Sequence, residues 1–464
     1  MKNIRNYLER DFERILSYVV VLPFLFLSIQ FIVLNVFNLY ESPVRFYVQI
    51  ATKVLTGLSF AVALPLVVKR SLFVSFVAYT VCVIIFLASY IIYPENRVFM
   101  RSEMFQIFAV NLPLMLYVQS ISNKSVFIKS TYSVGKYIGC FMTILGLIRL
   151  WGELEGRTYS MSFSYYLLFP CLLEMRELFS KFCLKKFAFL LLMVILIVMK
   201  GSRGALACIA VFYVFMLFSK HTYFGNNKRE NIEKKFVLFL LMTMLVIFNQ
   251  QFFSVIGSVA DALNINSRTA SIMSKEILID ESKNEMLLLE KLSLSEPKES
   301  LVGNQKEDAD NEEPSPESYN RSLEKTELSN GGIYLAGRGV LYRIVWNSIK
   351  ESNYRGLGLL GDRLVLGGQY AHNVVLEFFS HFGVFIGGTI AFLYVLCLLY
   401  VWVKTDKNGA ELISIWTALG IVPLMFSGSY LLHMHFWILN GIILMNGREI
   451  YYAKKRGYEK KSNN

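Results

Sequence analysis

Long apolar runs recur along almost the whole chain, and they constrain its fold more than any other feature. Of the 464 residues, 54% are hydrophobic, and several runs reach the roughly 20 residues that a helix needs to cross a bilayer. The sequence therefore predicts an all-α, polytopic membrane protein with about twelve transmembrane helices. The predicted spans lie near 15–39, 44–68, 72–93, 104–121, 134–150, 159–173, 187–200, 204–219, 236–256, 373–403, 409–427 and 430–446.

The distribution of basic residues predicts the orientation of these spans. With the N-terminus inside, the inside segments hold 26 Lys and Arg residues and the short outside loops hold seven. Such a bias places the basic side in the cytoplasm, so both termini, including the basic tail 447–464, are predicted to be cytoplasmic. Because the basic residues lie between membrane spans, topology explains the net charge of +12 better than a nucleic-acid partner does.

The segment between the ninth and tenth predicted spans, residues 257–371, is predicted to be a large extracytoplasmic loop. It separates nine spans in 1–256 from three in 372–446. Within it, 276–327 holds fifteen Asp or Glu against six Lys or Arg, which predicts disorder because too little apolar surface can be buried. The loop then turns basic. In GRGVLYRIVWNSIKES, apolar residues at helical spacing predict a short amphipathic helix lying on the membrane.

The sequence KGSRGA, beginning at Lys200, forms a very short predicted outside turn between the seventh and eighth spans. Ser202 is expected to cap the next helix, whose N-terminal N–H groups favour an anion. Arg203 adds a planar guanidinium suited to phosphate oxygens. A turn that only anchors Arg203 to lipid headgroups is the alternative, and we favour a phosphate or diphosphate site.

A second polar group falls in GLGLLGDRLVLGGQYAHNVVLEFFSHFG, which begins at Gly356. Its glycines predict a tightly turned loop that holds charged residues close to the tenth span. An interfacial loop would also explain this pattern, but the collected charges suggest a site. The candidate residues are Asp362, Arg363, His372, Asn373 and Glu377, with His381 on the same helix face as Glu377, and Arg338 upstream between two glycines.

The chain lacks the usual signatures of metal and nucleotide sites. His433 and His435 are two residues apart, which splays their rings on a helix, and we expect no metal there. No P-loop is present, and no Asp-x-Asp pair lies in a predicted outside segment. We therefore predict a reaction that needs no metal, nucleotide or other cofactor.

KGSRGA at the end of one span, a large outside loop with GR and GLGLLGDR, and the closing HNVVLEFFSHFGVFIGG together resemble the O-antigen polymerase and ligase family. The similarity covers about 185–405, and the acidic segment 276–327 departs from it. It implies a bacterial plasma-membrane glycosyltransferase that uses polyprenyl-diphosphate-linked glycans as donor and acceptor. It also implies flippase and chain-length regulator partners.

The resemblance implies that Arg203, Arg338 and His372 bind the diphosphate and activate the acceptor. The chemistry of these residue types agrees, since guanidinium groups stabilise a departing diphosphate and a histidine can take a hydroxyl proton. Lys200, Ser202, Asp362, Arg363, Asn373 and Glu377 are the expected substrate-binding residues.

The expected activity is polymerisation of lipid-linked repeats into a surface polysaccharide. A ligase that transfers the glycan to lipid A-core is the alternative within the family. A polysaccharide flippase is the alternative from another class, and it predicts charged residues along several spans. Here only Lys53 interrupts a span at mid-length, which favours the enzyme. A structural or signalling membrane protein would leave Arg203 and His372 without a role.

Overall fold

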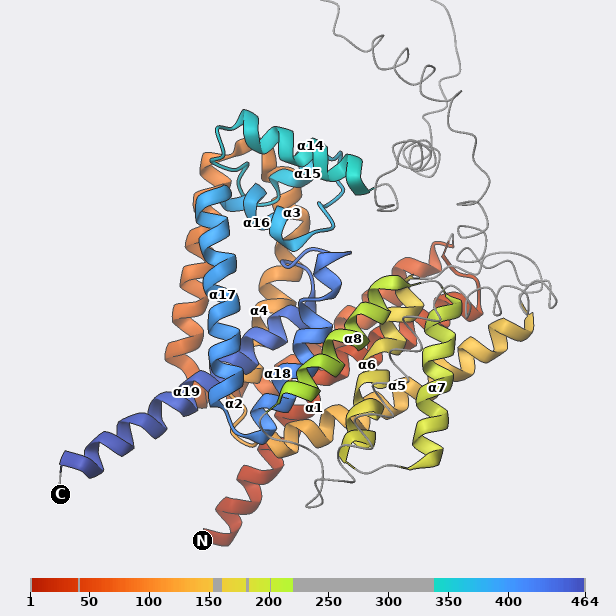
Figure 1. Cartoon of the computed structure of the whole chain (residues 1–464), viewed down its shortest axis with the longest axis vertical. Helices are drawn as coiled ribbons and strands as arrows, with labels where there is room; N and C mark the ends of the chain where they lie inside the picture. Colours follow the sequence, from red (N-terminus) through yellow and green to blue (C-terminus); the bar gives the residue numbers. More distant parts are fainter. Residues whose placement is uncertain are drawn as a thin grey trace, which may run out of the picture.

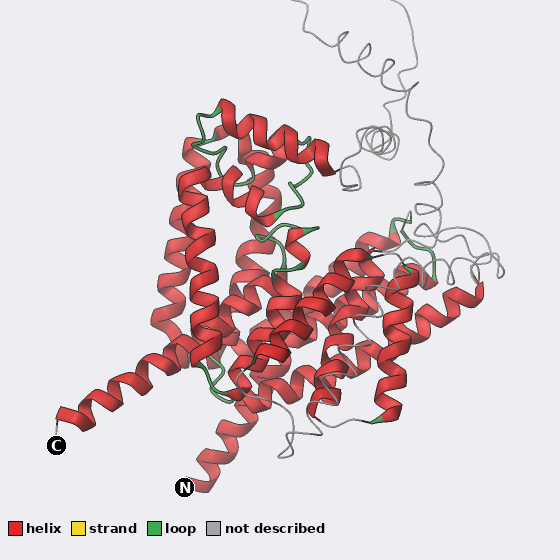
Figure 2. Ribbon diagram, viewed as in Figure 1, coloured by secondary structure: helices red, strands yellow, loops and turns green. Residues whose placement is uncertain are grey.

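The computed structural model describes residues 2–40, 42–152, 161–180, 183–200, 202–219 and 338–462. Every regular element in these ranges is a helix (Figure 2). The predicted ninth span 236–256, most of the predicted extracytoplasmic loop and its acidic segment 276–327 lie outside the described residues.

Five helical stretches are long and apolar enough to cross a membrane. The structure thus supports a membrane protein with several spanning helices, whereas a count of twelve and the orientation remain predictions. The five stretches are Asp11–Val36, Val44–Ile92, Lys124–Ile148, Val384–Lys404 and Lys407–Met425.

The second and third predicted spans form one element, α2 (Val44–Ile92), which follows α1 (Lys2–Val36). A straight helix of 49 residues would be about 74 Å long, more than twice the roughly 30 Å of a hydrocarbon core. Ser71 breaks it, with a non-helical φ of −144°. The two halves therefore match the lengths predicted at 44–68 and 72–93.

The other spans predicted up to residue 219 coincide with helices. The helices after α2 are η1 (Pro94–Asn96), α3 (Arg97–Phe105), η2 (Gln106–Asn111), α4 (Leu112–Gln119), α5 (Lys124–Gly152), α6 (Met161–Ser180), α7 (Leu184–Met199) and α8 (Arg203–Phe218). The predicted span 104–121 covers the end of α3, the π-helical turn η2 and α4.

The C-terminal part contains α14 (Arg338–Glu351), α15 (Gly361–Val365), α16 (Val374–Phe382), α17 (Val384–Lys404), α18 (Lys407–Gly420), η3 (Pro423–Met425) and α19 (Met434–Ser462). The single span predicted at 373–403 is thus two helices, α16 and α17. Gly383 separates them with a φ of +80°, which a glycine adopts without strain. A Cβ at Gly387 would lie 2.4 Å from the Phe378 carbonyl oxygen, so the two helices pack in backbone contact.

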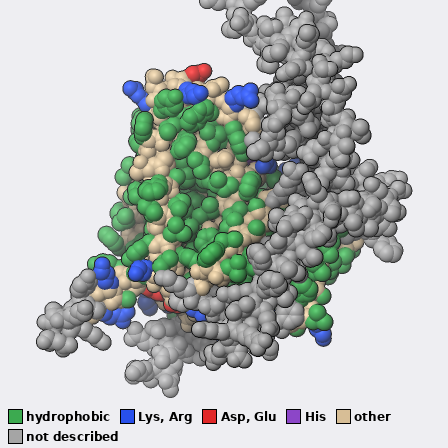
Figure 3. Space-filling model, in the orientation of Figure 1, with side chains coloured by type: hydrophobic (Ala, Val, Ile, Leu, Met, Phe, Trp, Pro, Cys, Tyr) green, Lys and Arg blue, Asp and Glu red, His purple; other side chains and the backbone are tan. Residues whose placement is uncertain are grey.

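Helix α18 lies at the centre of the bundle, with 83% of its apolar window buried. Trp416 on this helix is fully buried, and its ring lies 5.8 Å from that of Phe24 and 5.9 Å from that of Phe169. By contrast, only 6% of the corresponding window of α2 is buried. Figure 3 shows a broad hydrophobic surface with Lys and Arg side chains above and below it, as expected of helices that face lipid.

The predicted amphipathic helix is present as α14, but its apolar face is covered by protein. Val345 and Ile349 are fully buried in a cluster with Ala371, and Leu376 and Phe379 pack against that cluster. The prediction that this face lies on the membrane is therefore wrong. Periodicity gives the apolar face of a helix, but not the surface that covers it.

Candidate functional site

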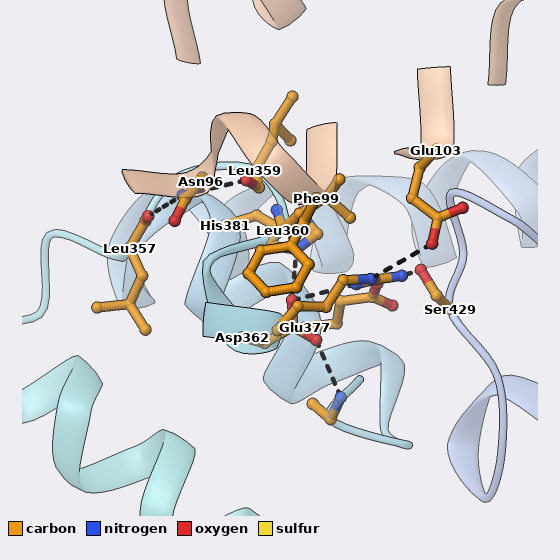
Figure 4. Close-up of polar contacts among 12 residues, drawn as sticks. Asn96, Phe99, Glu103, Leu357, Leu359, Leu360, Asp362, Glu377, His381 and Ser429 are labelled. Atoms are coloured by element: carbon orange, nitrogen blue, oxygen red, sulfur yellow. Dashed lines mark hydrogen bonds and ion pairs between the residues drawn. The ribbon is translucent and has the colours of Figure 1, made fainter. Parts of the chain in front are cut away.

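A buried cluster of charged and polar side chains lies where α15, α16, α3 and the segment before α19 meet (Figures 1 and 4). We call it the Asp362 cluster. Its members, except half-buried Glu103, are almost inaccessible to solvent. They are Glu103, Asp362, Arg363, Glu377, His381, Ser429 and Tyr430.

Asp362 connects the glycine-rich loop to α16. It accepts hydrogen bonds from the Ala371 amide (2.9 Å) and from Arg363 Nη1 (3.3 Å), and its Oδ1 lies 3.2 Å from His381 Nε2. Burial alone would raise the pKa of Asp362, but the hydrogen bond to His381 and the charges of His381 and Arg363 lower it overall. Asp362 is therefore ionised although it is buried, because its neighbours favour the charged form.

His381 holds the loop backbone in place. The Leu360 amide nitrogen lies 3.1 Å from its Nε2, the nitrogen that faces Asp362, and its Nδ1 lies 2.9 Å from the Tyr430 hydroxyl. Leu360 has a φ of +61°, a left-handed conformation that costs a non-glycine residue free energy. His381 thus has three polar neighbours inside the protein, which is typical of a structural histidine.

Arg363 is 2% exposed and lies among three carboxylates. Its Nη1 is 3.3 Å from Asp362 Oδ1 and 3.9 Å from Glu377 Oε1, and its Nε is 3.8 Å from Glu103 Oε1. Its Nη2 is buried and has no hydrogen-bond partner among the described residues. The Nη2 donor can therefore bond to one more acceptor, and the role of Arg363 in binding substrate stays a prediction.

Glu377 joins α16 to the segment before α19. It accepts hydrogen bonds from the Ser429 hydroxyl and from the Tyr430 amide (3.1 Å). Burial raises the pKa of Glu377 to about 7, because little water reaches the carboxylate. Glu377 is thus part of the framework around Arg363.

His372 lies beside this cluster in a strained conformation. Its φ is +53°, its ring lies 4.2 Å from that of Tyr370, and its Nδ1 is buried without a hydrogen-bond partner in the described part of the chain. Burial and the charge of Arg338 lower the pKa of His372 to about 4. The imidazole is therefore neutral near pH 7 and has a free nitrogen, but a base with this pKa is weak. Strain at a residue with an unfilled hydrogen bond is typical of functional sites.

Arg338 and Arg363 are both close enough to Tyr370 to influence its ionisation. Arg338 begins α14, and the Arg363 guanidinium lies 5.8 Å from the centre of the Tyr370 ring. Next to His372, Asn373 caps α16 by accepting from the Val375 and Leu376 amides. Asn373 therefore has a structural role at the start of α16, and its contact with substrate stays a prediction.

The KGSRGA turn approaches the same region. Lys200 is buried at the end of α7, and Ser202 caps α8 as predicted, accepting from the Ala205 amide at 3.4 Å. A Cβ at Gly204 would lie 3.8 Å from Phe426, and the next residue, Ser427, hydrogen-bonds with Tyr370. The turn is thus close to the site, although about 170 residues separate it from His372. Arg203 begins α8, but its side chain lies outside the described residues.

Sequence reasoning missed the residues of η1, α3 and η2 that hold the site. Asn96 Nδ2 donates to the carbonyls of Leu357 (2.8 Å) and Leu359 (3.2 Å), and Asn111 Nδ2 donates to that of Leu431 (2.7 Å). Glu103, which lies between them in the sequence, points toward Arg363 (Figure 4). In the sequence, these residues could have been found only as polar residues within and just before the predicted span 104–121. The π-turn at Gln106–Asn111 is a feature found often near functional sites.

Asp362, Glu377 and His381 could in principle hold a metal ion, since their ligand atoms lie within 4.8 Å of one another. However, Arg363 already places a positive charge within 4 Å of both carboxylates, and a divalent cation there would be repelled by it. These three side chains therefore suit the Arg363 guanidinium better than a metal ion.

Comparisons with protein-family models, with curated proteins and with solved structures find no match for this chain.

Proposed function

We propose that this protein is a membrane glycosyltransferase that joins polyprenyl-diphosphate-linked oligosaccharide repeats into a cell-surface polysaccharide. The observation that carries the proposal is that His372 and Arg363 both lie against Tyr370, whose ring is 4.2 Å from that of His372 and 5.8 Å from the Arg363 guanidinium. His372 is a strained, neutral histidine with an unpartnered nitrogen, and Arg363 is a buried cation with an unfilled donor. A proton acceptor beside an anion-binding group is what glycosyl transfer from a lipid diphosphate requires.

In the proposed reaction, a hydroxyl of the acceptor sugar attacks the anomeric carbon of the donor. The carbon–oxygen bond to the diphosphate breaks, and the polyprenyl diphosphate leaves with the bonding electrons. Arg363 and Arg338 would stabilise the charge on this leaving group, with Arg203 joining from the nearby turn. His372 would take the proton of the attacking hydroxyl and later release it to water.

The same groups would serve a ligase, because only the acceptor differs. A transporter of lipid-linked glycans is less well supported, since a carrier needs no strained histidine beside its anion site. In the proposed orientation, the Asp362 cluster lies at the outer face of a bacterial plasma membrane, where lipid-linked glycans would be assembled.

The test compares surface polysaccharide in cells that express His372→Ala or Arg338→Ala at the abundance of the unmodified protein. We expect loss of long chains and accumulation of single lipid-linked repeats. Full-length chains held on the lipid carrier would instead identify a ligase. Arg343→Ala is the matched control, because Arg343 lies on the same helix as Arg338 and is exposed. Normal long chains from both variants would contradict the proposed mechanism.

A further inference from the structure

The last part of α19 leaves the helical bundle and is not covered by the described part of the protein. Figure 1 shows this helix running out from beside the lower end of α17 to the C-terminus. Residues 451–456 are all exposed, whereas Ile438, Leu439 and Ile442 earlier in the same helix are fully buried. Because these six residues make more than one helical turn, the helix is exposed on every side. We call residues 451–456 the exposed turn of α19.

The exposed turn follows the end of the bundle at which membrane-spanning stretches stop. On α19, the Asn446 side chain accepts from the Thr405 hydroxyl, and Glu449 pairs with Lys124. Thr405 directly follows the apolar stretch that ends at Lys404, and Lys124 begins another such stretch. The edge of the hydrocarbon layer is therefore expected near Asn446 and Glu449.

The exposed turn lies at the depth expected for lipid headgroups. Tyr452 is six residues beyond Asn446, or about 9 Å along the helix. The headgroup layer on each side of the hydrocarbon core is about 5–8 Å thick. In Figure 1, α19 is tilted relative to α17, which brings the turn closer to this layer than its distance along the helix implies. Tyrosine is enriched at this depth in membrane proteins.

The exposed turn is both basic and aromatic. It contains Lys454, Lys455 and Arg456 and no acidic residue. Tyr451 is 64% exposed and Tyr452 is 53% exposed. At spacings of three and four along a helix, Tyr451 neighbours Lys454 and Lys455, and Tyr452 neighbours Lys455 and Arg456. These side chains thus form one continuous surface of cations and amphipathic rings.

The acidic residues of the tail do not cancel this charge. Residues 447–464 contain six Lys or Arg and two Asp or Glu. One of the acids, Glu449, already pairs with Lys124, and the other, Glu459, is followed directly by two lysines. An excess of positive charge at headgroup depth attracts anionic lipids.

We propose that the exposed turn of α19 binds anionic phospholipid headgroups at the membrane surface, through Lys454, Lys455 and Arg456. Tyr451 and Tyr452 would lie among the headgroups, with their rings toward the acyl chains and their hydroxyls toward water. Because the turn directly continues a helix of the bundle at headgroup depth, a lipid surface suits it better than an acidic protein. The contact is independent of the proposed glycosyl transfer.

The test measures how far lipid shields a probe inside the exposed turn. Ala453→Cys, in the full-length protein without its native cysteines, carries a nitroxide spin label, with one protein molecule per nanodisc. The nanodiscs contain phosphatidylcholine alone or mixed with phosphatidylglycerol, and collisions with a neutral nickel complex report access from water. Each basic side chain near an anionic surface favours the bound state about fivefold. The nickel accessibility should therefore fall severalfold when phosphatidylglycerol is present.

Neutralising the exposed turn should abolish this fall, as should high salt, which screens surface charges. The neutralised variant combines Lys454→Gln, Lys455→Gln and Arg456→Gln. The matched control removes the same amount of charge from exposed positions near the same end of the bundle and should behave like the unmodified protein. It combines Lys69→Gln, Lys404→Gln and Lys407→Gln.

Equal nickel accessibility in the two lipid compositions would overturn the proposal. High values in both would mean that the turn is solvated, and low values in both would mean that protein or acyl chains cover it. A fall that persists in the neutralised variant, or that disappears equally in the matched control, would also overturn the proposal. Shielding by added polyglutamate in place of phosphatidylglycerol would assign the surface to an acidic protein instead.

Discussion

At the residue scale, the site depends on charges that are buried together. Arg363 is surrounded by Asp362, Glu377 and Glu103, and two of these carboxylates are themselves inaccessible. Removing one member of such a group leaves another charge uncompensated in a poorly solvated environment. The cluster therefore couples the stability of the loop to the position of Arg363.

Asp362→Ala should lower the free energy of unfolding by about 3–5 kcal/mol, the cost of breaking a buried ion pair. The substitution removes the nearest of the three carboxylates around Arg363 and leaves the Ala371 amide without its acceptor. Thermal unfolding of the purified protein measures the effect. Glu351→Ala on exposed α14 is the control and should change the stability by about 0.5 kcal/mol or less. Equal stabilities would show that the cluster contributes nothing to the fold.

The pH dependence of the reaction should reflect the unusual environment of His372. Because its pKa is lowered to about 4, the base form persists well below pH 6.5, and polymer formation in vesicles should change little between pH 5.5 and 7.5. Arg338→Gln removes one cause of the low pKa, so the acid limb of the normalised profile should move to higher pH. An acid limb near pH 6.5 in the unmodified protein would exclude His372 as the base.

The lowered pKa of His372 also makes the stability of the fold depend on pH. The pKa of His372 is lower in the folded protein than the ordinary value of 6.5. Between these values the unfolded chain binds more protons than the folded one. The contribution of His372 to stability therefore falls as the pH decreases from about 6.5 to about 4.

At the element scale, the start of α8 fits closely against α6 and the segment before α19. A Cβ at Gly204 would lie 2.3 Å from the Tyr165 hydroxyl oxygen, so a side chain there requires the Tyr165 ring to move. The glycine of KGSRGA thus allows a close helix approach, and that approach places the turn beside Phe426.

Gly204→Ala should therefore reduce polysaccharide synthesis by displacing the start of α8 from the site. Tyr165→Phe removes the oxygen that the new methyl group meets, so the double variant should recover activity relative to Gly204→Ala. Chain length at matched protein abundance is the measurement. If the double variant is no better than the single one, this contact does not set the position of the turn.

At the scale of the whole molecule, the helices separate two polar ends. The Asp362 cluster lies at one end, and a polar cavity lies at the other, where Arg70, Lys124 and Arg448 come together. These three residues belong to segments whose basic side chains predict a cytoplasmic location. The proposed topology thus places the two ends on opposite sides of the membrane.

In a background without the native cysteines, Glu351→Cys on α14 should react with an impermeant thiol reagent in intact cells. Arg456→Cys on α19 should react only after the membrane is opened. Both positions are exposed in the structure, so burial does not limit the labelling. The reverse pattern would invert the orientation, and labelling of both in intact cells would exclude opposite sides.

Several features follow from the sequence alone because they depend on neighbouring residues. Run lengths predicted most helices, helical spacing predicted α14, and Ser202 was predicted to cap α8. The sequence also singled out Asp362, Arg363 and His372, which the fold brings together. Such signals are local, since hydrogen bonds to a cap and the period of a helix involve only residues a few positions apart.

The tertiary structure decided what each of these elements contacts. Asn96 bonds to Leu357, Asn111 to Leu431, and Glu103 pairs with Arg363, across 260 residues or more in the chain. Likewise, the apolar face of α14 is covered by protein, and the run at 373–403 is divided at Gly383. Contacts of this range arise when the helices pack, and packing depends on the shapes of both surfaces. The composition of either segment alone contains no information about its partner.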